Sequence, residues 1–237
     1  MRQMKAIIKR ELAAYFTSPI GYVYLGVMYL LSGFFLFSMV LINNSSVLTP
    51  VFQILMTIIM FLTPLLTMRL MSEDKRHRTD QALLTAPVSL AAIVGGKFLA
   101  AAAVYAGGIS VTLVYAVTLS FLARVNWAII WGNYIALLLL GFSFISIGQF
   151  ISSLTENQAI AAIGSLAVML LLFFIDVIPQ IIPNPRVAAL IGGLSLIKRY
   201  TPITNGILSL SNLFFFISVC AVFLFLTTRV LEKRRWS

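Results

Sequence analysis

The chain alternates long apolar blocks with short polar or proline-containing breaks. Each block is about twenty residues or longer, which is the length that an α-helix needs to cross a hydrocarbon core of about 30 Å. The breaks are rich in Asn, Ser, Pro and charged residues, which favour turns and loops. The pattern therefore predicts an all-α integral membrane protein with six transmembrane helices, at residues 20–42, 51–71, 98–122, 127–152, 158–178 and 211–230.

The stretch between the fifth and sixth predicted spans, residues 179–210, has a mixed character. It is semi-apolar, but prolines and basic residues leave no uninterrupted apolar run of spanning length. We therefore expect short re-entrant or interfacial helices there, and no seventh span. The interrupting residues are Pro179, Pro183, Pro185, Arg186, Lys198, Arg199 and Pro202.

Composition agrees with lipid as the main solvent of this chain. Of the 237 residues, 60% are hydrophobic and 10% are charged, whereas soluble domains carry roughly 25% charged residues. We expect residues 1–237 to form a single transmembrane domain, because so few polar side chains cannot cover a globule. The formal net charge of +10 would suggest nucleic acid as the partner of a soluble chain. Here the basic residues flank apolar blocks, so the lipid bilayer is the expected partner and nucleic acid is not.

The distribution of Lys and Arg predicts the orientation of the spans. Thirteen of the 17 basic residues lie before the first span, around the loop after the second span, or after the last span. Positively charged segments resist translocation across the membrane. We therefore predict a multi-pass protein of the cytoplasmic (inner) membrane with both termini cytoplasmic and with residues 179–210 outside. The four basic residues on the outer side are Arg124, Arg186, Lys198 and Arg199.

Residues 1–18 have the pattern of an amphipathic helix that lies in the membrane interface and ends at Pro19. Glu11 projects near the apolar face, where an unpaired carboxylate would be costly, so it needs a partner cation or a polar subunit surface. A basic leader that only sets topology is the alternative, but it does not explain the apolar stripe. The stripe contains Met4, Ile7, Ile8, Leu12, Tyr15 and Phe16, and the opposite face contains Arg2, Lys5, Lys9 and Arg10.

Residues 72–97 read as a charged turn, a short helix, Pro87 and a second short helix. Thr79 and Ser89 can cap these helices, since each side-chain oxygen can accept a free first-turn amide hydrogen. This arrangement suggests a cytoplasmic docking surface for a soluble partner. A solvated charged loop is the alternative, and composition alone favours it. The apolar side of the segment would contain Leu83, Leu84 and Val88.

Several features together resemble the ABC-2-type permeases over essentially the whole chain. They are the amphipathic N-terminal helix with Lys9-Arg10-Glu11-Leu12 and Ser18-Pro19, the two spans that follow, and the segment from Glu73 to Lys97 with Leu84-Thr85-Ala86-Pro87-Val88-Ser89. Within that family the chain is most similar to the branch of gliding-motility-associated and copper-enzyme-maturation permeases. It departs from the family at Arg78-Thr79-Asp80-Gln81, where a Gly-Thr pair often precedes the coupling helix.

The resemblance implies a permease subunit that couples ATP hydrolysis to substrate export or to transmembrane mechanical work. The expected partners are a cytoplasmic ABC ATPase subunit, which binds ATP and Mg, a second permease copy in a homodimer or a paralogue, and an extracytoplasmic accessory subunit. The helix of residues 1–18 and the 72–97 segment would rest on the ATPase. The resemblance assigns this coupling contact to Glu11, Glu73, Asp74, Arg76, Thr79, Asp80, Gln81, Leu84 and Pro87.

The sequence offers no catalytic or metal site of its own. A phosphate-binding loop needs Gly-x-x-x-x-Gly-Lys followed by Ser or Thr, but Gly96-Lys97 has Ala91 and Phe98 at the remaining positions. His77 is the only histidine and Cys220 the only cysteine, so neither a serine nucleophile with its base nor a metal ligand set can be assembled. We expect no enzyme activity and no cofactor in this chain.

Polar residues in the spans are candidates for a transport pathway or for interhelical hydrogen bonds. For Asn133 and Gln149, hydrogen bonding between helices is the favoured interpretation. Asp176 is ionisable but near the outer interface. A scaffold that does not transport and a secondary carrier remain alternative functions with the same topology. The candidates are Asn133, Gln149, Gln158 and Asp176.

Overall fold

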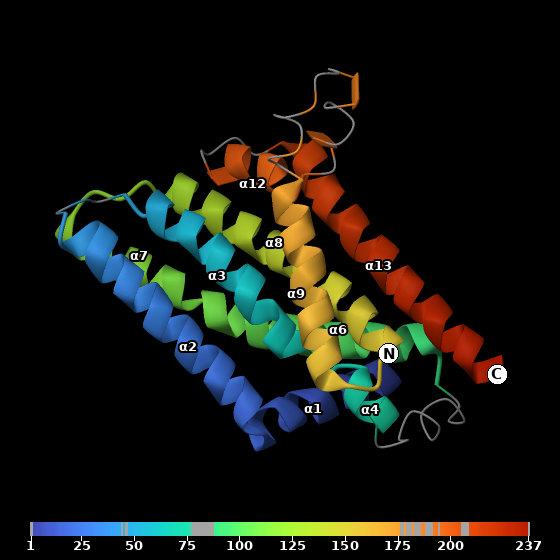
Figure 1. Ribbon diagram of the computed structural model, residues 1–237. Helices are drawn as coiled ribbons and strands as arrows, with labels where there is room; N and C mark the ends of the chain where they lie inside the picture. Colours follow the sequence, from blue (N-terminus) through green and yellow to red (C-terminus); the bar gives the residue numbers. More distant parts are fainter. Residues whose placement is uncertain are drawn as a thin grey trace.

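The computed structural model describes residues 2–43, 45, 47–76, 88–175, 178, 182, 186–187, 192–193, 195–204 and 209–236. Helices account for all the regular structure in these residues (Figure 1). The α-helices are α1 (Arg2–Thr17), α2 (Pro19–Leu36), α3 (Thr49–Thr67), α4 (Ser72–Arg76), α6 (Leu90–Ile109), α7 (Val111–Leu122), α8 (Trp127–Leu154), α9 (Gln158–Phe174), α12 (Leu196–Thr204) and α13 (Leu210–Trp236), and a π-helix, η1 (Phe37–Leu41), follows α2.

Helix α8 is the centre of the bundle. It packs against α3, α6, α9, α12 and α13, and 67% of its most apolar stretch is buried. The corresponding share is 22% for the α2–η1 span and 17% for α13. These two peripheral helices therefore present apolar side chains outward, among them Phe34, Phe214 and Phe225, as lipid-facing helices do.

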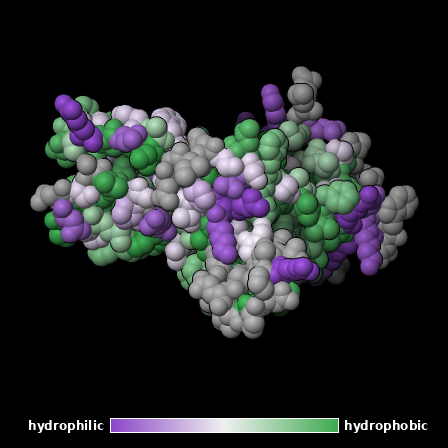
Figure 2. Space-filling view, turned by 90° about the horizontal axis from the view of Figure 1, so that it is seen from above, coloured by the Kyte–Doolittle hydropathy of each residue, from purple (hydrophilic) through white to green (hydrophobic). Residues whose placement is uncertain are grey.

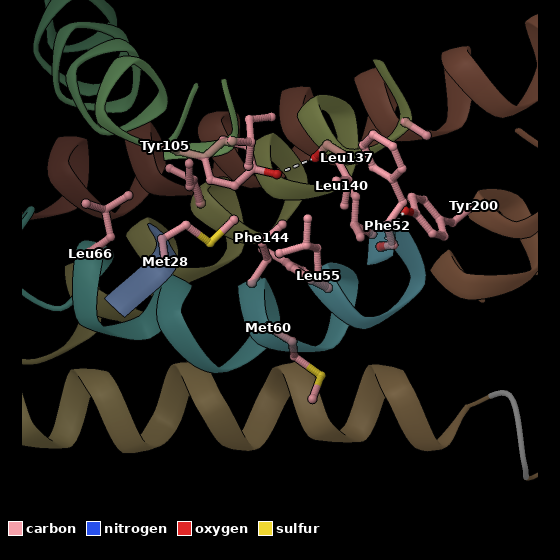
Figure 3. Close-up of a cluster of buried hydrophobic side chains, with 14 of the residues drawn as sticks. Met28, Phe52, Leu55, Met60, Leu66, Tyr105, Leu137, Leu140, Phe144 and Tyr200 are labelled. Atoms are coloured by element: carbon pink, nitrogen blue, oxygen red, sulfur yellow. Dashed lines mark hydrogen bonds between the residues drawn. The ribbon is translucent and has the colours of Figure 1, made fainter. Parts of the chain in front are cut away.

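The core around α8 is made of large side chains from several helices. Figure 3 shows Leu55 and Phe52 of α3, Tyr105 of α6, Phe144 of α8 and Tyr200 of α12 in one cluster. The Tyr105 hydroxyl donates a hydrogen bond to the Leu137 carbonyl, which satisfies the polar atom of a fully buried ring. Aromatic residues therefore both fill this core and link its helices.

Five helices in the described residues are long and apolar enough to cross a membrane: Pro19–Leu41, Thr49–Arg76, Leu90–Leu122, Trp127–Leu154 and Leu210–Arg234. The chain is a multi-pass membrane protein, as predicted. The predicted fifth span, 158–178, corresponds to Gln158–Phe174, which is apolar but has only 17 residues. The count of six spans therefore stays a prediction.

The third span begins earlier than the sequence pattern predicted. Helix α6 starts at Leu90, where Ser89 accepts a hydrogen bond from the Ala92 amide. Residues 90–97, expected to be a second short helix of a loop, are instead the first turns of this long helix, so that expectation was wrong. The charge of Lys97 suggested that the segment ending there is a loop. Lys97 is instead inside the helix, and its charge is compensated within the protein, as described below.

The two ends of the bundle differ in structure. Helices α1 and α4 and both ends of the chain lie at one end, and α12 lies at the other (Figure 1). Helix α1 runs across its end of the bundle because Pro19 cannot continue it, and Ser18 is extended. Seen from the α12 end, hydrophilic residues form separate patches among apolar ones (Figure 2). Whether α1 lies in the plane of a membrane stays a prediction.

Replacement of Gly141 by Ala tests the packing of α6 against α8. A Cβ at Gly141 would lie 2.1 Å from the Cζ atom of Tyr105, and the hydrogen bond of that ring opposes any shift. We expect a loss of stability of about 1–3 kcal/mol, measured as a lower thermal unfolding midpoint in detergent. Gly26→Ala is the matched control, because no heavy atom lies within 4 Å of its added Cβ. Equal midpoints for both variants would contradict the packing described.

Candidate functional site

A cluster of four charged residues lies where α1, α4 and α6 meet. Lys97 of α6 places its Nζ atom 3.0 Å from Glu11 Oε1 of α1 and 2.7 Å from Asp74 Oδ2 of α4. Arg10 of α1 lies 2.6 Å from Glu11 Oε1 and 3.6 Å from Asp74 Oδ2. We call Arg10, Glu11, Asp74 and Lys97 the ion cluster. It joins α1 to α4 and α6, two helices that lie far later in the sequence.

The ion cluster is neutral and largely removed from solvent. The side chain of Lys97 is 2% exposed, and those of Glu11 and Asp74 are 11% and 17% exposed. Arg10 is 48% exposed, so it covers the solvent side of the cluster. A buried ammonium needs compensating charge, and two carboxylates with a second cation provide it.

Close backbone packing brings α1 onto α6 at this point. Ile7, Glu11 and Tyr15 are spaced by four residues and form the buried face of α1. A Cβ at Gly96 would lie 2.9 Å from Ile7 Cγ2, so a residue with no side chain allows this approach. The Gly96-Lys97 pair therefore has two linked roles. Gly96 allows α1 to pack closely against α6, and Lys97 pairs with the Glu11 carboxylate of α1.

Arg69, just after α3, provides a second attachment for α1. Its guanidinium donates to the Ala14 carbonyl at 3.2 Å and to Ser18 Oγ, lies over the Tyr15 ring, and pairs with Glu73 at 2.8 Å. The Tyr15 hydroxyl donates to the Leu66 carbonyl at 2.7 Å. Burial raises the pKa of Tyr15 well above its usual range, so this hydroxyl keeps its proton and its hydrogen bond.

The end of α8 holds α4 in place. Ser152 Oγ accepts hydrogen bonds from the Met71 and Ser72 amides, both at 3.1 Å, and donates to the Met68 carbonyl at 3.0 Å. Lys75 of α4 is buried and donates to the Ser153 carbonyl. The helix that carries Asp74 and Glu73 is therefore fastened directly to the central helix of the bundle.

Comparison with protein families gives one match. The family described as ABC-2 family transporter protein matches residues 51–228, which is 178 of the 237 residues. The chain belongs to the ABC-2 family of transporter proteins. Comparison with curated proteins finds no match. The matched range contains Asp74 and Lys97, whereas α1 with Glu11 lies before it.

In this ABC-2 family protein, only part of the predicted coupling contact falls in described residues. Glu11 and Asp74 pair with Lys97 in the ion cluster, Glu73 pairs with Arg69, and Arg76 is exposed on α4. The ATPase contact predicted for these four residues stays a prediction. The other predicted contact residues lie outside the described residues: Thr79, Asp80, Gln81, Leu84 and Pro87.

Sequence reasoning did not include Lys97, Arg10 or Arg69 in the candidate site. A signal for Lys97 was present, because a lone lysine seven residues into an apolar helix needs a carboxylate partner. The requirement that Glu11 meet a partner cation was recognised from its place on the apolar face. The sequence did not indicate that this cation is Lys97, because 86 residues separate Glu11 from Lys97.

Two of the four predicted polar residues of the spans, Asn133 and Gln149, form hydrogen bonds between helices. Asn133 Nδ2 donates to the Ile129 carbonyl at 2.8 Å and to the Thr204 carbonyl at 3.1 Å, which links α8 to α12. Gln149 Nε2 donates to the Val94 carbonyl at 3.0 Å, which links α8 to α6. Gln158 is half-buried at the start of α9, and Asp176 lies outside the described residues. A transport role for these residues stays a prediction.

Replacement of Lys97 by Met should destabilise the protein by roughly 3 kcal/mol or more, because Glu11 and Asp74 then remain buried with only Arg10 to compensate them. The measurement is thermal unfolding in detergent. Lys9→Met, on the exposed side of α1, is the matched control and should unfold like the wild type. Adding Glu11→Gln and Asp74→Asn to Lys97→Met should restore most of the loss. An unchanged unfolding midpoint for Lys97→Met would show that the cluster is not a structural unit.

Proposed function

We propose that this chain is the membrane-spanning permease subunit of an ABC transporter and that a separate ATPase subunit binds ATP and Mg and supplies the energy. The observation that carries the proposal is the match of residues 51–228 to the ABC-2 transporter family. The work done would be substrate export or mechanical work across the membrane. Both alternatives use the same connection between the ATPase and the helices.

The ion cluster supplies that connection. A displacement of α1 or α4 would reach α6 through Lys97 and α8 through Ser152 and Ser153. Charge pairs in a buried position resist separation, because each partner would otherwise be left uncompensated. The three helices should therefore move as one body when the ATPase closes on them.

The Gly96-Lys97 pair of this chain supports the assignment of ATP to another subunit. In a phosphate-binding loop, the lysine reaches the phosphates and the glycines shape a loop around them. Here Gly96 is inside helix α6 against Ile7, and the Lys97 ammonium is paired with two carboxylates. Neither residue is placed to hold a nucleotide.

The exposed apolar surface of two peripheral helices supports the proposal of a further partner, which would be a second permease copy or a paralogue. The α2–η1 span and α13 are long and apolar, and most of their surface is exposed in the single chain. A second copy would cover part of this surface and lipid the remainder. An extracytoplasmic accessory subunit and membership in the gliding-motility and copper-enzyme-maturation branch complete the proposal.

Replacement of Glu73 by Ala tests the coupling role. Glu73 is 34% exposed, but its partner Arg69 is only 10% exposed, so loss of Glu73 should lower stability by about 1–3 kcal/mol, as when a buried donor loses its acceptor. If it also contacts the ATPase, capture of the ATPase subunit by the tagged chain should weaken by roughly tenfold. Affinity purification from native membranes, followed by an ATP hydrolysis assay, measures the capture of the ATPase subunit.

Glu232→Ala is the control for loss of a carboxylate that pairs with an arginine, because Glu232 pairs with Arg229 on an exposed helix surface. Its ATPase capture should equal that of the wild type. If the wild-type chain recovers no ATP-hydrolysing subunit, the permease assignment fails and a scaffold is favoured. Transport that continues without ATP but stops when the proton gradient is dissipated would favour a secondary carrier.

Cysteine labelling tests the proposed orientation, with both termini in the cytoplasm and the protein in the inner membrane. In a background with Cys220 replaced by Ala, a cysteine at Lys198 of α12 should react with a membrane-impermeant maleimide in intact cells. A cysteine at Lys9 of α1 should react only after the membrane is permeabilised. Both positions are exposed. Reaction of both cysteines in intact cells, or the reverse order, would contradict the orientation predicted from charge.

A further inference from the structure

Helix α1 has three neighbouring rows of residues, and the residues of each row are four positions apart, so that each row runs along one side of the helix. The first row is buried against the bundle and carries the Glu11 carboxylate of the ion cluster. The other two rows line an open groove of about 420 Å³ on the surface of α1. The three rows are Ile7-Glu11-Tyr15, Ile8-Leu12-Phe16 and Lys5-Lys9-Ala13.

The two lysines of this groove carry charge that no described residue compensates. Lys5 and Lys9 are exposed, and neither forms an ion pair with a described residue. They are about one helical turn apart, where like charges repel each other. The neighbouring Arg10, in contrast, pairs with Glu11 and Asp74. An anion that contacted both ammonium groups would relieve the repulsion, so the groove is suited to an anionic ligand.

The apolar row of the groove continues onto the first span. The exposed Phe16 ring meets the Tyr22 ring of α2 edge to face, with 5.7 Å between the ring centroids. Tyr22, Leu30 and Phe34 lie in one row of α2 and are all exposed. This helix is one of the five that can cross a membrane. A lipid chain that lies along α2 would therefore lead directly to the groove, which favours a phospholipid over a soluble anion.

We propose that the groove of α1 binds an anionic phospholipid. Its phosphate would lie between the Lys5 and Lys9 ammonium groups, and part of an acyl chain would lie on Ile8, Leu12 and Phe16. Basic residues beside a membrane attract anionic headgroups, and an amphipathic helix buries its apolar row at the boundary between headgroups and acyl chains. Because the ion cluster holds the buried row of α1, a lipid in the groove would hold the helix from another side. The site does not depend on the proposed ATPase partner.

Native mass spectrometry of the delipidated full-length chain tests the site by titration with phosphatidylglycerol and with zwitterionic phosphatidylcholine. One lysine near an anionic headgroup contributes roughly fivefold in affinity, so the wild type should bind phosphatidylglycerol roughly twentyfold more tightly than phosphatidylcholine. Lys5→Gln together with Lys9→Gln should remove this preference, and each single change should reduce it roughly fivefold. An unchanged preference in the double variant would overturn the proposal.

Lys233→Gln is the matched control. It removes another exposed lysine at the same end of the bundle, but on α13 and outside the groove (Figure 1). Its preference for phosphatidylglycerol should equal that of the wild type. Loss of the preference in this variant would show that the chain responds to total charge, and the assignment to the groove would be wrong.

Phe16→Ala separates the apolar row from the charge. The acyl chain is the same in both lipids, so this change should weaken both by the same factor of several-fold and leave the preference for phosphatidylglycerol intact. Unchanged binding of both lipids would overturn the placement of the acyl chain. Phe16 is exposed, so the variant should unfold at nearly the same temperature as the wild type.

Two results would assign the groove to a different ligand. Free sn-glycerol 3-phosphate has no acyl chain and should bind at least tenfold more weakly than phosphatidylglycerol. Equal binding would show that the groove takes a soluble phosphate ester. If the double lysine variant keeps its lipid preference but captures less of an ATPase subunit from native membranes, the groove is part of the ATPase contact and the lipid proposal is wrong.

Discussion

The compensation of one buried ammonium group determines how the α1 end of this protein is built. Lys97 lies inside an otherwise apolar helix, and an isolated charge there would be strongly destabilising. The structure places Glu11 and Asp74 within ion-pair distance of it, from α1 before the first span and from α4 at the end of the second. The need to pair one charge therefore fixes the relative positions of α1, α4 and α6. Arg69 adds a second attachment for α1, and Ser152 and Ser153 of α8 attach α4 directly to the central helix.

The remaining helices are joined by polar groups on the central helix α8. Ser143 donates toward the Phe216 carbonyl of α13, Gln149 to the Val94 carbonyl of α6, and Asn133 to the Thr204 carbonyl of α12. In lipid, apolar contact alone gives little drive for association, so small residues and hydrogen bonds hold helices together. The polar residues of α8 thus have an evident structural purpose. Among the described residues, Asn133 Oδ1 and Gln149 Oε1 are the buried side-chain polar atoms of this helix that have no hydrogen-bond partner.

The two ends of the bundle have different chemistry. At the α1 end, charges are paired with one another and hold helices in a fixed arrangement. At the α12 end, Arg124 is exposed beside a partly apolar cavity. The proposed coupling to an ATPase subunit would use this fixed arrangement at the α1 end.

The sequence by itself determined the membrane class, the approximate spans and the amphipathic N-terminal helix, because these follow from local hydropathy and from proline at residue 19. It also indicated that Glu11 needs a partner, since a carboxylate beside an apolar face cannot remain unpaired. Only the tertiary structure decided that the partner is Lys97 and that residues 90–97 belong to the third span. Both depend on a close approach of α1 to α6 at Gly96. Local patterns cannot show which distant segments meet, so they cannot distinguish a lysine that ends a helix from one that is neutralised within it.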